Sequence, residues 1–149
     1  MANVFDIASY ITNLIEVDKL KLQKLLFYIQ AVSLVEYNKP AFPDKIEAWE
    51  YGPVVPVVYK KIKKYDVPIK VKRVTNDPID TNVIKSIDMV IKYYSGMSGI
   101  ELMAETHSEP PWINAYKKGV NSEITIKAIK DYYKIKDYYK TVYTFKNNA

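Results

Sequence analysis

The chain has 149 residues, with no cysteine, one histidine, His107, and four glycines. The absence of cysteine excludes disulfide bonds and cysteine-ligated zinc. A single histidine excludes multi-histidine metal sites and any reaction that needs two imidazoles. Four glycines leave no Gly-rich loop to hold phosphates, and no side-chain nucleophile stands in a pattern that supplies its base. We therefore expect no metal, no cofactor and no enzymatic activity.

Long apolar runs and arginine are also scarce. No run approaches the roughly 18–20 residues that span a bilayer, so we expect a cytoplasmic protein without a membrane partner. The net charge is +5, but Arg73 is the single arginine among 22 basic residues. Arginine is the side chain that grips phosphate and reads guanine, so this composition argues against a nucleic-acid partner. The chain is 48% hydrophobic, enough for one core, and residues 1–149 are expected to form a single domain.

The apolar pattern predicts a mainly α fold. In a helix over residues 18–37, apolar side chains such as Leu22, Leu25, Leu26 and Ile29 lie on all sides of the axis, which is typical of a buried helix. We expect a compact bundle of about six helices around this central one. Alternation in residues 46–51 and 69–74 also allows a small two-stranded β ribbon. A last helix, capped by Thr125, carries an apolar stripe that extends to Tyr139 and Tyr143.

The stretch GPVVPVV, residues 52–58, combines prolines with valines. Proline removes a ladder hydrogen bond from a strand but is tolerated in the first turn of a helix, so the prolines favour a helix that starts near Pro53. Its valines would face inward and its lysines outward, and Gly52 would form a sharp turn before it. We therefore interpret five residues as structural, namely Gly52, Pro53, Val54, Val55 and Pro56.

Three stretches, in this order, resemble the signature blocks of the Panacea domain, also called the SocA-like antitoxin or phage-associated GepA family. They are LKLQKLLFYIQ (residues 20–30), IEAWEYGPVVPVVYKKIK (46–63) and ETHSEPPWINA (105–115). With the segments between them, the resemblance spans essentially the whole chain. Two positions depart from the family pattern: Ala31 replaces a frequent glycine, and Tyr116 replaces a frequent arginine near His107.

The resemblance implies a mostly helical antitoxin of a bacterial or prophage toxin–antitoxin system, which neutralises a co-encoded toxin by direct binding. The family pairs with unrelated toxins, so the identity of the toxin is not implied, and neither is the oligomeric state. Two alternatives stay open. One branch resembles a proteolytic adaptor that delivers its toxin to a Clp-type protease, and a DNA-binding autorepressor would use the lysine face of residues 60–64.

Polar and aromatic residues of the three blocks are the candidates for binding the partner. They are Lys21, Gln23, Lys24, Tyr28, Glu47, Trp49, Tyr51, His107, Glu109 and Trp112. One hypothesis places the hydrogen-bonding members in a polar groove between the central helix and the turn at residues 109–112. The competing hypothesis is an internal network that orders the core.

Overall fold

The computed structural model describes residues 1–135 of the chain, and Tyr139 and Tyr143 of the predicted apolar stripe lie outside them. In chain order the elements are α1 (Val4–Leu14), α2 (Lys19–Tyr37), β1 (Ile46–Trp49), β2 (Gly52–Val54), α3 (Pro56–Ile62), α4 (Thr81–Tyr94), α5 (Gly99–His107), α6 (Pro110–Lys118), β3 (Ser122–Ile124) and α7 (Ile126–Ile135). The mainly α fold is confirmed. Within the described part of the chain, no helix is both long and apolar enough to cross a membrane.

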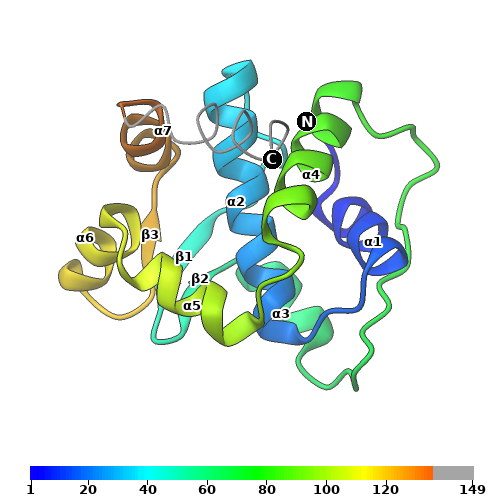
Figure 1. Cartoon of the computed structure of the whole chain (residues 1–149), viewed down its shortest axis with the longest axis horizontal. Helices are drawn as coiled ribbons and strands as arrows, with labels where there is room; N and C mark the ends of the chain where they lie inside the picture. Colours follow the sequence, from blue (N-terminus) through cyan, green and yellow to red (C-terminus); the bar gives the residue numbers. More distant parts are fainter. Residues whose placement is uncertain (136–149) are drawn as a thin grey trace.

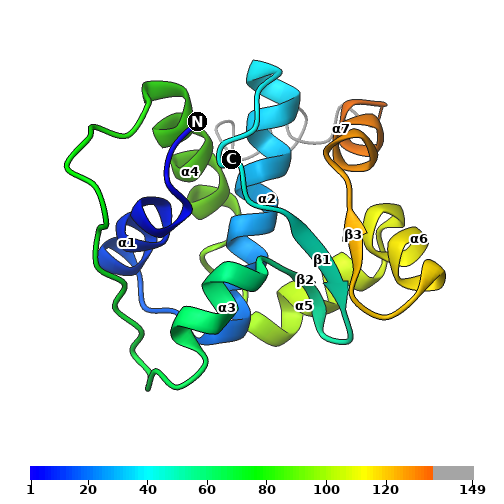
Figure 2. The ribbon, with the colours of Figure 1, turned by 180° about the vertical axis from the view of Figure 1, so that it is seen from behind.

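Helix α2 is the centre of the fold, as its apolar pattern predicts. Every residue from Leu22 to Leu34 is buried. Helices α1, α3, α4, α5 and α7 all pack against α2. Figures 1 and 2 show α1 and α4 on one side of it, and the strands with α6 and α7 on the other. A helix that is apolar all round is stable only in such a surrounded position.

The helix starts follow the capping residues in the sequence. Asp18 accepts a hydrogen bond of 2.7 Å from the backbone N–H of Lys21 at the start of α2. Ser98 and Glu101 form the reciprocal capping box that their spacing predicts at the start of α5. Thr125 accepts a bond of 3.1 Å from the N–H of Ala128 in α7. These short-range signals therefore position the helices around α2.

The sheet differs from the predicted ribbon. It has three antiparallel strands in the order β2-β1-β3. The first predicted strand is present as β1, but it pairs with β2 and β3 and not with residues 69–74. Residues 69–74 form no strand. Their backbone instead bonds to side chains of α1: the N–H of Val71 donates to Thr12 and that of Val74 to Asp6. Asp6 also pairs with Arg73 at 3.1 Å, so the single arginine serves to hold this connection.

The proline-rich stretch contains a strand and a helix. Residues 52–54 form β2, and α3 begins at Pro56, so the predicted helix start near Pro53 is wrong by three residues. Pro53 is compatible with β2 because β2 is an edge strand, where a missing N–H is tolerated. Val55, Val58 and Ile62 are buried, as the predicted inward face requires.

Candidate functional site

A pocket of about 450 Å³ lies between the first turns of α2, the β1–β2 hairpin and α3. We name it the hairpin pocket. Its lining residues are Lys19, Leu20, Gln23, Lys24, Trp49, Glu50, Tyr51, Val54, Tyr59, Ile62, Val120 and Asn121. Tyr51, Tyr59 and Val120 expose 61%, 40% and 75% of their surfaces, so the pocket has an apolar and aromatic rim that faces solvent. Four of the ten predicted partner-binding residues meet here.

Lys24 forms part of the pocket wall but has no solvent-exposed surface. Its ammonium donates a hydrogen bond of 3.0 Å to the backbone carbonyl of Pro53 in β2. Burial lowers the pKa of Lys24 to about 7, and the attraction of Asp18 offsets part of that effect. A titratable amine is therefore buried beneath the hairpin with a neutral carbonyl as its hydrogen-bond acceptor.

Gln23 fixes the end of the hairpin to α2. Its side-chain oxygen accepts a bond of 2.8 Å from the N–H of Val55, and its amide nitrogen donates to the Val55 carbonyl at 3.4 Å. Gln23 is 4% exposed, so both bonds are sheltered from water. An unpaired backbone group at this depth would cost free energy, and the glutamine satisfies both groups of Val55 at once.

Gly52 lets the hairpin approach Lys24. Its φ of +107° is one that side chains rarely adopt, and a Cβ there would lie 2.6 Å from Lys24 Cε. We expect Gly52→Ala to lower the free energy of unfolding by about 1–3 kcal/mol, measured by urea denaturation. Gly96 has no atom within 4 Å of such a Cβ, so Gly96→Ala is the matched control and should not destabilise. Equal effects of the two changes would contradict this explanation.

A second group of signature residues lies in the core, where Glu109 links α2 to α7. Glu109, 5% exposed, accepts hydrogen bonds from the hydroxyls of Tyr28 at 2.6 Å and Tyr133 at 3.0 Å. Tyr28 also stacks on Tyr94, with ring centroids 4.3 Å apart. Burial raises the pKa of Glu109 to about 7, although the two tyrosine hydrogen bonds act in the opposite direction. This part of the signature forms a buried network, as one of the two hypotheses proposes.

A third group is aromatic and only half-buried. The Trp112 indole donates a bond of 2.9 Å to the Trp49 carbonyl, and its ring packs on His107 at 4.0 Å and on Tyr116 at 4.7 Å. Burial lowers the pKa of His107; a hydrogen bond with the Glu50 backbone raises it, and nearby Lys24 lowers it further. Its position beside the hairpin and near Lys24 thus disfavours the protonated imidazole.

The remaining predicted residues lie around these groups. Glu47 accepts a bond of 2.9 Å from the Trp49 indole and pairs with Lys45 at 3.1 Å on the hairpin surface. Lys21 points away from the hairpin pocket and donates to the Ser95 carbonyl at 2.7 Å. The ten residues thus occupy several distinct places. Their roles in binding a partner stay predictions.

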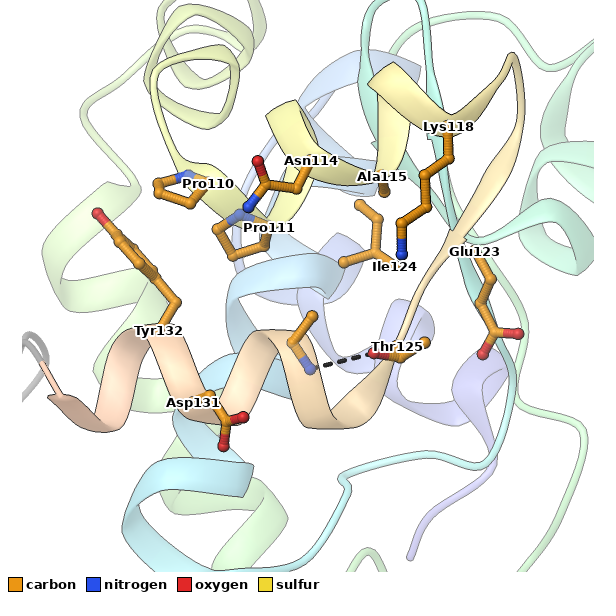
Figure 3. A pocket seen from close by; sticks show the side chains of 11 residues that line it. Pro110, Pro111, Asn114, Ala115, Lys118, Glu123, Ile124, Thr125, Asp131 and Tyr132 are labelled. Carbon is orange, nitrogen blue, oxygen red and sulfur yellow. Dashed lines mark hydrogen bonds between the residues drawn. The ribbon is translucent and has the colours of Figure 1, made fainter.

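A second pocket, of about 300 Å³, lies between α6, β3 and α7. Pro111 and Asn114 of α6 lie across it from Asp131 and Tyr132 of α7 (Figure 3). It contains none of the ten predicted residues. Elsewhere in residues 1–135, no three acidic or histidine side chains are arranged to hold a metal ion. The hairpin pocket is therefore the better candidate site.

Comparison with known proteins assigns the family. Residues 22–113 match the family described as "Antitoxin SocA-like, Panacea domain". The chain is 30% identical over 138 residues to Antitoxin SocA of Caulobacter vibrioides, which covers 80% of this chain and 73% of that protein. The chain belongs to the SocA-like, Panacea-domain family. No solved structure matches it.

Membership of the SocA-like family confirms the resemblance carried by the three signature blocks. It suggests an antitoxin role and hence a toxin partner. Sequence reasoning missed several pocket residues, and among the large hydrophobic ones Val120 is the most exposed. A signal existed: Val120 follows Gly119 and precedes Asn121 in a turn, where an apolar side chain has no core to enter. Tyr59 stands in the second signature block, but it is not among the ten residues predicted to bind the partner.

Proposed function

We propose that this protein is an antitoxin that neutralises a co-encoded toxin by binding it directly through the hairpin pocket and its rim. The observation that carries the proposal is the exposed aromatic and aliphatic surface around a pocket that the signature residues build. Tyrosine and tryptophan dominate the binding energy of protein interfaces when they surround a well-packed pocket. Tyr51, Tyr59 and Trp49 supply these residue types here.

Direct binding of the toxin to this surface is favoured because the exposed apolar residues of the rim lie together. An isolated exposed apolar side chain is ordinary, whereas a group of them around a hollow is typical of an interaction site. Tyr59 packs edge-on against Trp49 with ring centroids 4.8 Å apart, so this part of the rim is ordered before binding. An ordered anchor loses little conformational entropy on association, which strengthens binding.

The experiment is co-expression with the product of the adjacent reading frame, scored by growth and by co-purification. Val120→Asp should weaken binding by about 2 kcal/mol, roughly thirtyfold, and abolish growth rescue, because a charge would enter the apolar rim. The matched control is Val74→Asp, since Val74 is also exposed, at 53%, but lies in the connection between α3 and α4. Rescue of growth by both variants alike would refute the assignment of this surface.

A further inference from the structure

Lys24 is a buried amine whose ammonium charge the fold itself does not balance. An ammonium has three N–H donors, and the described chain provides one hydrogen-bond acceptor, the Pro53 carbonyl. None of the ion pairs formed by residues 1–135 involves Lys24. Buried charges in folded proteins are normally paired, because an unpaired one is costly to remove from water. The position of Lys24 in the wall of the hairpin pocket suggests what its complement is.

The surroundings of Lys24 favour an anion from outside. Asp18 attracts its charge through space, and its own charge lowers the pKa of His107. The pocket wall contributes one further cation, Lys19, and one acid, Glu50. The wall of the hairpin pocket therefore holds two amines, Lys19 and Lys24, against one carboxylate, Glu50, and most of its other lining residues are apolar or aromatic.

We propose that the hairpin pocket receives an acidic side chain, Glu or Asp, from a segment of the toxin in which an apolar side chain stands beside it. The carboxylate pairs with Lys24, and the apolar neighbour packs against Trp49 and Tyr59. Because one hydrogen bond holds the ammonium, rotation within its flexible side chain directs it into the pocket. This inference rests on the proposed function, since it states the chemistry of the toxin surface that the same site recognises.

A consequence is that binding takes up protons. Burial holds the pKa of Lys24 at about 7, and an adjacent carboxylate favours the ammonium form and raises this pKa. At pH 8 most Lys24 side chains are neutral before binding and charged afterwards. Calorimetry of the binding reaction at pH 8 in two buffers with different ionisation enthalpies measures this uptake. Pairing at an exposed lysine, which is already charged at pH 8, produces no such uptake.

The test uses two defined peptides, acetyl-Leu-Glu-Leu-Glu-amide and acetyl-Leu-Gln-Leu-Gln-amide, with the full chain. We expect the glutamate peptide to bind at least about tenfold more tightly. Lys24→Met should remove that difference. Lys70→Met should preserve it, because the Lys70 ammonium also donates to a backbone carbonyl, that of Thr12, but far from the pocket. Equal affinities of the two peptides for the unaltered protein would overturn the inference, as would an undiminished difference in a folded Lys24→Met variant.

The toxin itself separates this inference from the proposed function. If the adjacent gene product binds and Lys24→Met binds it equally well, the acidic-segment inference fails and the antitoxin function stands. If that product does not bind but the glutamate peptide shows the Lys24-dependent preference, the pocket chemistry stands and the proposed function fails. Displacement of the glutamate peptide by a duplex DNA oligonucleotide would overturn the inference in favour of nucleic acid.

Discussion

Replacement of Lys24 by methionine is expected to stabilise the fold, by about 2–4 kcal/mol at pH 7. Two opposing contributions decide whether Lys24→Met raises or lowers the free energy of unfolding. Burial lowers the pKa of Lys24 from 10.5 to about 7, which corresponds to a cost of about 5 kcal/mol for the native state. Loss of the donor to the Pro53 carbonyl costs about 1–3 kcal/mol. Methionine retains the unbranched apolar stem, so packing against the hairpin changes little.

The pH dependence of that gain identifies its cause. Between pH 7 and pH 10.5 the unfolded chain binds a proton at Lys24 that the native chain does not, so native stability rises with pH. The stability gain of Lys24→Met is therefore complete below pH 7 and fades as the pH rises towards 10.5. Urea denaturation at pH 7 and pH 9 measures this, with Lys70→Met as the control that should show little change at either pH. A destabilised Lys24→Met variant would mean that the Pro53 hydrogen bond outweighs the buried charge.

If Lys24→Met both stabilises the fold and loses binding, the combination distinguishes a residue retained for a partner from one retained for the core. A residue retained only to order the core should lower stability when it is removed. A residue retained for a partner can be removed with a gain in stability and a loss of affinity. Lys24→Met is expected to show the second behaviour, whereas Gly52→Ala, which changes the hairpin backbone, should show a loss of stability.

The sequence predicted the elements that depend on local signals. The start of α2 at Asp18 and the capping box of α5 follow from hydrogen bonds within a few residues, so their spacing is visible in the chain. The central position of α2 follows from its all-round apolar pattern. Such features require no knowledge of which distant segment packs where.

The sheet and the site could not be predicted in this way. Whether residues 69–74 pair as a strand depends on Asp6 and Thr12, more than fifty residues away, which bond to that backbone instead. The location of β2 depends on its place at the sheet edge, where Pro53 is tolerated. Sequence reasoning singled out Lys24 as a partner-binding residue, but its burial follows from the close approach of Gly52.

Glu109 is expected to have the second large effect on native stability, and its pH dependence is opposite to that of Lys24. Burial raises its pKa from 4.5 to about 7, so between these values the native chain binds a proton that the unfolded chain has lost. Native stability should therefore fall as the pH rises from 4.5 to 7, by about 3 kcal/mol. His107, whose pKa is lowered by burial, contributes a smaller change in the other direction because it is only half-buried.

The Glu109→Gln variant isolates this contribution. Its amide oxygen can still accept from Tyr28 and Tyr133, but it does not titrate, so its free energy of unfolding should lack the fall between pH 5 and pH 7. Glu36→Gln changes an exposed glutamate of α2 and should keep the fall of the unaltered protein. Parallel curves for the unaltered protein and Glu109→Gln would show that the Glu109 carboxyl titrates at its ordinary pKa. A fall confined to proteins with Glu109 would instead establish that burial in the core raises the pKa of this signature glutamate.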